Sequence, residues 1–292
     1  MSKIVCFGEV LWDVFPTHKK IGGAPLNVAL RLNYFGNYVT IISSVGNDIE
    51  GKEIIDFIKI NNVNTDEIQV NNEFNTSQVK VVLDKSGSAS YNIAFPCAWD
   101  YIQLKDASKN SVSKSDAFIF GSLVTRNDVS RVTLIQLLKF AKFKVFDVNL
   151  RAPHYTMIVL NELMIEADFI KFNDDELLEI CKYYDFKSNN LEESIKYISN
   201  KTNTQSICVT LGGDGAILFK GNTFYKSSGY SVKVKDTVGA GDSFLATLIH
   251  GLLNNEKPQD AINLACAVGA LVASMDGANP IILKADIESI ME

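Results

Sequence analysis

The stretch Asp236-Thr237-Val238-Gly239-Ala240-Gly241-Asp242 lies where an extended run turns into a helix. Residues 230–235 alternate as in a strand, and beyond the stretch apolar residues recur at helical spacing, at positions 244, 245, 248, 249 and 252. Free N–H groups and the positive end of a helix dipole meet at such a junction, which favours an anion. Small residues let a phosphate approach the backbone closely. We therefore predict an anion site here.

Asp242 places a carboxylate at this same point. Asp followed by Ser is a common helix cap, and Gly-Ala-Gly can be a simple tight turn. Alternatively, the carboxylate is a general base beside a phosphoryl group in transfer. The heptapeptide alone leaves both interpretations open.

The composition limits the class of protein. The 292 residues are 47% hydrophobic and 21% charged, as in ordinary globular proteins. The net charge of −6 argues against nucleic acid or an anionic membrane as the main partner. No apolar run reaches the roughly 18 residues that span a bilayer. The five scattered cysteines form no zinc or disulfide pattern, so we expect a cytoplasmic protein.

Strand and helix patterns alternate along almost the whole chain, which predicts a mostly parallel sheet covered on both faces. The predicted strands are 3–7, 38–45, 116–121, 144–148, 168–172 and 206–211. The predicted helices are 25–35, 51–61, 128–141, 157–166, 174–183, 191–200, 243–253 and 258–275. Ligands of such sheets bind beyond the carboxyl ends of the strands.

Two segments depart from this alternation. Residues 9–21 continue past the first strand as a second extended stretch, and residues 77–95 read as a hairpin with a turn at 84–88. Both fit an antiparallel flap outside the main sheet. A plain edge hairpin without a function is the alternative.

A second glycine-rich helix start lies at Gly22-Gly23-Ala24-Pro25-Leu26-Asn27. Pro25 suits a first helical turn, and the Asn27 amide can point back toward the loop. Asp13, just past the first strand, could accept hydrogen bonds from the hydroxyl groups of a sugar. A simple turn and a solvated carboxylate are the plainer interpretations.

Three more polar segments follow predicted strands. In Asp147-Val148-Asn149-Leu150-Arg151, alternation would put Asp147, Asn149 and Arg151 on one side, where Arg151 could balance phosphate charge. Asn173-Asp174-Asp175-Glu176 could hold magnesium through waters, cap a helix, or both. Thr210-Leu211-Gly212-Gly213-Asp214-Gly215 could wrap a nucleotide or form a glycine turn.

Two common nucleotide motifs are excluded. Gly46 to Lys52 has the spacing G-x-x-x-x-G-K, but Glu53 follows where a P-loop needs Ser or Thr. No G-x-G-x-x-G occurs, which argues against a nicotinamide oxidoreductase.

Taken in order, these segments resemble the ribokinase/PfkB family of carbohydrate kinases nearly end to end. The resemblance begins with Gly8-Glu9-Val10-Leu11-Trp12-Asp13-Val14 and the 22–29 segment, and ends with the 236–244 segment and Gly277-Ala278-Asn279-Pro280. Its opening, with Gly121-Ser122-Leu123 and the 146–151 segment, looks most like bacterial fructokinases. The fold it implies is α/β, a ribokinase-like three-layer α/β/α sandwich over 1–292, with a small antiparallel β lid at about 12–21 and 77–99.

The resemblance also implies roles for individual residues. Asp242 would be the base, Gly239, Ala240, Gly241 and the Asp242 N–H the anion hole, and Arg151 a contact of the phosphoryl group or sugar. The sugar would meet Asp13, Gly23 and Asn27, with Phe95 or Trp99 closing on it. Asn173 and Glu176 would order Mg²⁺, while Thr210, Gly212 and Gly215 would lie along ATP. Asp236 and the Val238 carbonyl resemble a K⁺ site.

The activity implied is ATP-dependent phosphorylation of a free sugar, with D-fructose to fructose 6-phosphate as our first expectation. Ribose, 2-keto-3-deoxygluconate, tagatose phosphate or a nucleoside as acceptor stays open, and so does a non-catalytic sugar or nucleotide sensor. An exposed lid edge could pair two chains into a homodimer.

Overall fold

The computed structural model describes residues 1–83 and 89–292, so the predicted turn at 84–88 lies outside the described residues. Within this part of the chain, nine strands form one sheet in the order β13-β12-β11-β10-β9-β8-β1-β4-β5. Seven of them pair in parallel: β1 (Lys3–Phe7), β4 (Tyr38–Gly46), β5 (Ile68–Asn71), β8 (Ala117–Gly121), β9 (Lys144–Asp147), β10 (Phe169–Asn173) and β11 (Ser206–Thr210). The antiparallel strands β12 (Ala216–Lys220) and β13 (Thr223–Ser227) complete one edge.

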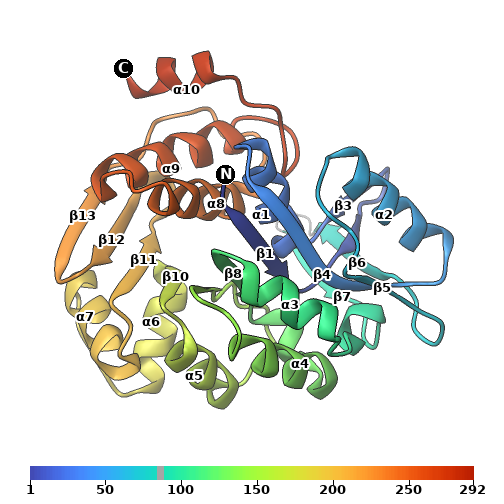
Figure 1. Ribbon diagram of the computed structural model, residues 1–292. Coiled ribbons are helices and arrows are strands. Elements are labelled where there is room, and N and C mark those ends of the chain that lie inside the picture. Colours follow the sequence, from blue (N-terminus) through green and yellow to red (C-terminus); the bar gives the residue numbers. More distant parts are fainter. Residues whose placement is uncertain (84–88) are drawn as a thin grey trace.

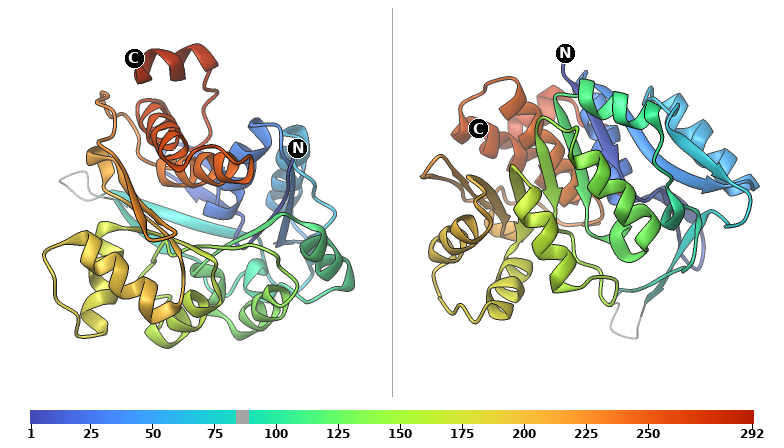
Figure 2. Two further views of the ribbon diagram at one scale, coloured as in Figure 1. Left: turned by 60° about the vertical axis from the view of Figure 1, so that its left-hand side comes forward. Right: turned by 60° about the horizontal axis from the view of Figure 1, so that its bottom comes forward.

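Helices cover both faces of this sheet (Figure 1). One face carries α1 (Ala24–Tyr34), α2 (Ile49–Ile60), α8 (Ala240–Leu253) and α9 (Pro258–Ala273), and α10 (Lys284–Met291) packs on α9. The other carries α3 (Asp106–Lys114), α4 (Asp128–Leu138), α5 (Met157–Glu166), α6 (Asp174–Tyr183) and α7 (Leu191–Thr202). The left view of Figure 2 shows these two helical layers on opposite sides of the strands. The three-layer sandwich is thus confirmed.

Each face of the sheet has its own hydrophobic core. Phe118, Phe120 and Phe146 lie in the core below α3–α7, whereas Ile4, Cys6 and Ile119 lie in the core below α1, α8 and α9. Strands buried on both faces read as continuous apolar runs, which is why Ala117–Gly121 and Ser206–Thr210 could be predicted as central strands. All five cysteines are buried and free.

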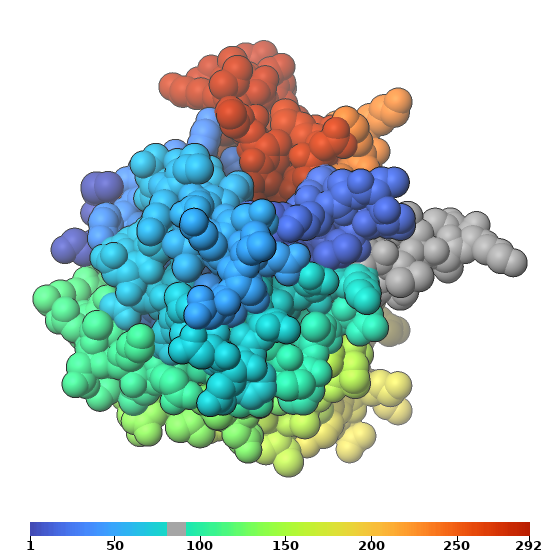
Figure 3. Space-filling model, turned by 90° about the vertical axis from the view of Figure 1, so that its right-hand side faces the viewer, coloured from blue at the N-terminus to red at the C-terminus, as the bar shows by residue number. Residues whose placement is uncertain are grey.

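A second, four-stranded sheet in the order β3-β2-β6-β7 corresponds to the predicted lid and is called the lid sheet below. Its strands are β2 (Leu11–Val14), β3 (Lys19–Gly22), β6 (Ser77–Leu83) and β7 (Ala89–Ile93). The β2–β3 and β6–β7 pairs are antiparallel as predicted, but β2 and β6 are parallel. In Figure 3 the N-terminal lid residues (dark blue) lie between the C-terminal helices (red) and the later lid residues (teal).

The prediction of a strand at 230–235 is wrong. The main sheet ends at β13, and residues 230–235 form no strand. The N–H groups of Lys235 and Asp236 instead donate to the carbonyl of Ala273 at the end of α9, at 2.8 and 3.2 Å. Alternation in the sequence could not reveal that the backbone would pair with a helix end.

Candidate active site

A buried ion pair lies at the carboxyl ends of β9 and β10. The Lys171 Nζ donates to Asp147 Oδ1 at 3.0 Å, and neither side chain is more than 8% exposed. Asp147 Oδ2 is buried without a hydrogen-bond partner in the described residues. Lys171 was not among the site residues predicted from the sequence. A lysine inside the apolar run 168–172 nevertheless indicates a buried ion pair, because lysine is rarely buried unless it is paired.

The first turn of α8 faces this pair. Gly239 precedes the helix with φ of 77°, and a Cβ there would lie 2.5 Å from the Ala278 Cα, so only glycine fits. The Ala240 N–H donates to the Thr237 carbonyl at 3.2 Å, so its predicted place in an anion hole is not supported. Within the described chain, the N–H groups of Gly239, Gly241 and Asp242 have no such acceptor.

Lys171 also lies close to this helix start. A Cβ built on Gly241 would be 3.5 Å from the Lys171 Nζ. An ammonium group and the positive end of a helix dipole repel each other unless an anion lies between or beside them. The arrangement is therefore suited to a phosphoryl group, as the heptapeptide predicted.

Asp242 is oriented from across the site by α1. The Asn27 Nδ2 donates to Asp242 Oδ2 at 2.8 Å. Burial, followed by the charge of Asp147, raises the pKa of Asp242 to about 6, and the Asn27 hydrogen bond, Lys171 and Arg151 oppose this rise. A carboxylate whose pKa lies near neutrality and whose lone pairs are not used for a helix cap is suited to accept a proton.

The second glycine-rich helix start brings Asn27 to this position. Gly23 precedes α1 with φ of 113°, and a Cβ on it would lie 2.4 Å from the Glu9 carbonyl oxygen. Asn27 is buried in the first turn of α1, and the Asn279 Nδ2 donates to its Oδ1 at 2.8 Å. Asn279 is a second residue that sequence reasoning did not assign.

Asp13, in lid strand β2, lies beside the same group of charges. A Cβ on Gly22 would be 2.5 Å from Asp13 Oδ2, so glycine leaves room for this carboxylate. Burial raises the pKa of Asp13 to about 6, with Arg151 opposing the rise and Asp242 adding to it. Strand β2 thus places a carboxylate within electrostatic reach of Asp242.

Asn173 and Glu176 form a capping box at the start of α6. The Asn173 N–H donates to Glu176 Oε2 at 2.8 Å, and the Glu176 N–H donates to Asn173 Oδ1 at 2.7 Å. Glu176 Oε1 also accepts from the Leu150 N–H at 2.8 Å. Glu176 thereby joins the β9 end to the β10 end. Both of its oxygens retain lone pairs, but no cluster of three or more His, Cys, Asp or Glu side chains within the described residues could hold a metal directly.

Arg151 is placed differently from the predicted alternation. β9 ends at Asp147, and Asn149 has φ of 38°, so the backbone turns before residue 151 is reached. The Arg151 side chain is exposed and donates to the Leu150 carbonyl at 2.9 Å. The Arg151 charge still lowers the pKa values of Asp13 and Asp242, so the guanidinium lies close enough to act on both carboxylates.

The Thr210–Gly215 segment ends β11 in a tight turn. Thr210 Oγ1 donates to the Phe172 carbonyl at 3.3 Å, and Gly212 is exposed with open space where a Cβ would be. At Gly215, with φ of 91°, a Cβ would lie 2.0 Å from the Ser227 carbonyl oxygen. Backbone packing therefore explains Gly215, whereas Gly212 leaves a surface that a nucleotide could follow.

Asp236 joins two loops behind the anion site. Its Oδ1 accepts from the Val238 N–H at 3.0 Å and its Oδ2 from the Gly277 N–H at 3.1 Å. Both carboxylate oxygens keep lone pairs that a cation could use. Carboxylate oxygens are ligands that hard cations prefer, so Asp236 is compatible with a cation at this point.

The two aromatic residues predicted to close on the sugar differ in exposure. Phe95 is 57% exposed, whereas Trp99 is fully buried in the core of the main domain. Trp99 belongs to a short 3₁₀ helix after the lid (Ala98–Tyr101), with the Arg126 guanidinium 4.0 Å above its ring. Trp99 therefore cannot contact a sugar in this conformation, and that prediction is wrong.

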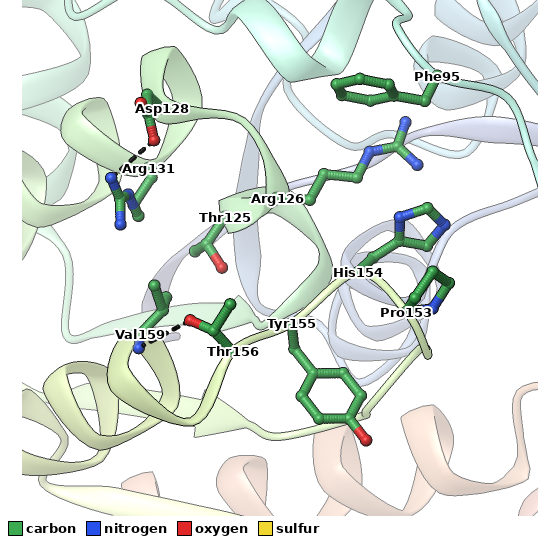
Figure 4. A pocket seen from close by; sticks show the side chains of 10 residues that line it. All are labelled: Phe95, Thr125, Arg126, Asp128, Arg131, Pro153, His154, Tyr155, Thr156 and Val159. Atoms are coloured by element: carbon green, nitrogen blue, oxygen red, sulfur yellow. Dashed lines mark hydrogen bonds and ion pairs between the residues drawn. The ribbon is translucent and has the colours of Figure 1, made fainter.

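A cavity of about 370 Å³ opens beside Phe95. Figure 4 shows Phe95 over the Arg126 side chain, with His154 and Tyr155 on the neighbouring wall. Arg126 is committed to Asp100, through bonds of 2.7 and 2.8 Å. Asp242, Asp13 and Asn27 are not among the residues that line this cavity, so it is distinct from the site described above.

No helix in the described part of the chain is both long and apolar enough to cross a membrane.

Comparison with known proteins identifies relatives of this chain among carbohydrate kinases. The profile of pfkB family carbohydrate kinases matches residues 1–285. A putative sugar kinase of Pyrococcus horikoshii is 32% identical over 252 residues, covering 83% of this chain and 76% of the relative. A probable chloroplastic fructokinase-6 of Arabidopsis thaliana is 28% identical, covering 95% of this chain and 79% of the relative.

Solved structures support the fold. The crystal structure of the Pyrococcus kinase matches with a TM-score of 0.85 at 27% identity over both full chains, and it has also been solved with ATP. A fructokinase of Vibrio cholerae, solved with fructose, ADP and calcium ion, matches with a TM-score of 0.86 at 24% identity, covering 100% of this chain and 99% of that one. The profile match over almost all of the sequence, together with a site suited to phosphoryl transfer, shows that the chain belongs to the pfkB family of carbohydrate kinases.

Proposed function

We propose that the protein transfers the γ-phosphoryl group of ATP to a hydroxyl of D-fructose, giving fructose 6-phosphate and ADP. The observation that carries this proposal is the placement of Asp242. Its carboxylate, oriented by Asn27, lies beside the free N–H groups of the α8 start and the Lys171 ammonium. A base and an anion site side by side are what transfer of a phosphoryl group to a hydroxyl requires.

In this mechanism Asp242 accepts the proton of the attacking hydroxyl as its oxygen bonds to the γ-phosphorus. The bond to the ADP oxygen breaks, and ADP leaves with that electron pair. The N–H groups of Gly239, Gly241 and Asp242, with the Lys171 ammonium, would stabilise the charge on the phosphoryl oxygens. Asp13, Gly23 and Asn27 would position the sugar, and the lid with Phe95 would exclude water and so limit hydrolysis of ATP.

The preference for fructose rests on the relatives. The Arabidopsis relative is named a fructokinase, and the Vibrio fructokinase was solved with fructose. Among the described residues, the cations that lower the pKa of the Asp13 carboxyl are Arg151 and Lys20. This favours a neutral sugar over a phosphosugar, which would need more positive charge to bind.

The residues present also fit the two cations of this chemistry. Mg²⁺ would be held mainly by ATP oxygens and waters, with Glu176, Asn173 and the unpartnered Asp147 Oδ2 as acceptors for those waters. It would neutralise charge on the transferred group. A K⁺ ion would take Asp236 and the Val238 carbonyl, which lie next to the anion site.

ADP release over a panel of sugars tests the proposal. The panel contains fructose, ribose, 2-keto-3-deoxygluconate, tagatose 6-phosphate and adenosine, each with and without K⁺. We expect fructose to give the highest kcat/KM. A higher value for another sugar would refute fructose alone, whereas sugar or ATP binding without ADP release would point to a sensor.

A further inference from the structure

Helix α1 bridges the start of α8 and the 279–280 loop at two successive levels. At the first level, Asn27 donates to Asp242 and accepts from Asn279, both at 2.8 Å. At the second, one turn further along, Arg31 donates to Ser243 Oγ at 3.2 Å and to the Pro280 carbonyl at 2.9 Å. Both contacts of Arg31 are therefore to the sequence neighbours of Asp242 and Asn279.

The direction of the Asn27 amide matters for the chemistry. An ionised carboxylate only accepts hydrogen bonds, so the Asn27 NH₂ group must face Asp242. The Asn27 carbonyl oxygen then faces the opposite way and needs a donor, because Asn27 is buried. Asn279 Nδ2 is that donor. A flipped Asn27 would turn its oxygen toward the carboxylate and repel it.

The position of Asn279 is itself fixed. Arg31 holds the next residue, Pro280, while Asp236 holds Gly277 two residues before it. The Asn279 Oδ1 is buried without a partner in the described residues, so this amide is retained at a cost in stability. A side chain kept for packing alone would not need a buried amide.

We propose that Asn279 is a positioning residue for phosphoryl transfer: its amide locks Asn27 in the orientation that donates to Asp242. The proposal rests on Asp242 being the base. Several other charged groups also act on Asp242: Asp147 from β9, Lys171 from β10, Arg151 after β9, Glu9 after β1 and Asp13 from β2. None of these groups contacts the Asn279 amide through a hydrogen bond among the described residues.

The test replaces Asn279 with leucine, which has a similar size and no donor. Without the Asn279 donor, the Asn27 amide can flip, and the protonated form of Asp242 becomes more populated at a given pH. The Asn27 hydrogen bond lowers the pKa of Asp242, so its loss raises that pKa, by about one unit for a hydrogen bond to a charged group. With fructose and ATP, kcat/KM should then fall about fivefold at pH 6, about twofold at pH 7 and little at pH 8.

Two further variants separate positioning from structure. Asn279→Gln keeps an amide donor and should restore most of the wild-type pH profile. Ile281→Ala changes an exposed residue of the same loop and should leave the profile unchanged. Asn279→Ala repeats the test if the leucine variant does not fold. A fall in kcat/KM by the same factor at every pH would overturn the proposal, because it would indicate structural damage.

A second measurement does not depend on activity. In protein labelled with ¹³C-aspartate, the Asp242 carboxyl signal is assigned by its loss in Asp242→Asn, and it is titrated in each variant. A midpoint near 6 in the wild type and about one unit higher in Asn279→Leu supports the proposal. Equal midpoints overturn it. Absence of fructose phosphorylation with a shifted midpoint would instead count against the proposed function alone.

Discussion

Replacement of Lys171 by methionine should damage both stability and catalysis, by separable amounts. Lys171 Nζ lies 3.0 Å from Asp147 Oδ1, and both side chains are buried. At an effective dielectric constant of about 20, two charges at this distance attract each other by about 5.5 kcal/mol. Removing one partner of a buried pair costs about 3–5 kcal/mol of unfolding free energy, because the other charge stays buried and uncompensated.

The double variant Lys171→Met, Asp147→Leu removes that uncompensated charge. Its unfolding free energy should therefore recover to near the wild-type value, since apolar replacement of a buried pair is often neutral. Its kcat should not recover. Loss of a charge that stabilises the transferred phosphoryl group should lower kcat by about 10²–10³ in the single and the double variant.

Urea denaturation gives the unfolding free energies, and initial rates of fructose-dependent ADP release give kcat. Lys144→Met on β9 is the matched control, because Lys144 pairs with the partly exposed Glu166 at 3.1 Å. It should cost less than about 1 kcal/mol and leave kcat unchanged. Recovery of kcat together with stability in the double variant would refute a catalytic role for Lys171.

Four further outcomes are expected. Because the pKa values of Asp242 and Asp13 are both raised to about 6, kcat/KM should rise through pH 6 and level off above pH 7. A value of kcat/KM that stays constant from pH 5 to 8 would exclude Asp242 as the base. Because the pKa of Asp242 is raised in the folded protein, the native state binds more protons than the unfolded state between about pH 4 and 6. The ionised carboxylate therefore destabilises the native state at pH 7, and urea denaturation should show Asp242→Asn to be more stable than wild type by about 1–3 kcal/mol. Below pH 4 the two proteins should be equally stable. Phe95→Ala should raise the KM for the sugar with little loss of stability, whereas Trp99→Ala should cost about 3–5 kcal/mol because the ring is fully buried; the reverse pattern would contradict their placement. If β3 or β7, the free edges of the lid sheet, pairs two chains, light scattering should give about twice the 32.3 kDa chain mass rather than the chain mass itself.

Local signals in the sequence were sufficient for most of the framework. Helices 157–166 and 174–183 were predicted with the bounds that the structure has, because their caps and apolar periodicity agree. The predicted strand ends at 148 and 172 lie within one residue of the observed ends at Asp147 and Asn173, because the apolar runs stop there. Glycines at a helix start predict an anion site at Gly239–Gly241; among the described residues the Gly239 and Gly241 N–H groups have no backbone acceptor, whereas the turn uses the Ala240 N–H.

The errors concern interactions between distant segments. Residues 230–235 alternate like a strand, but their end pairs with the α9 terminus. Its position in the sequence places Trp99 in the predicted lid, yet the 3₁₀ helix turns its side chain into the core. The Lys171–Asp147 pair joins residues 24 apart, and Asn27 and Asn279 are 252 apart. No local pattern specifies such partners, and only the assembled fold brings them together.

The most direct test of the central claim measures fructose-dependent ADP release by the wild type and by Asp242→Asn at pH 7.5, with ATP affinity measured in parallel. We expect the wild type to turn over. The variant should lose about 10² or more in kcat while it still binds ATP, as expected for removal of a general base. Near wild-type turnover by the variant would contradict the account.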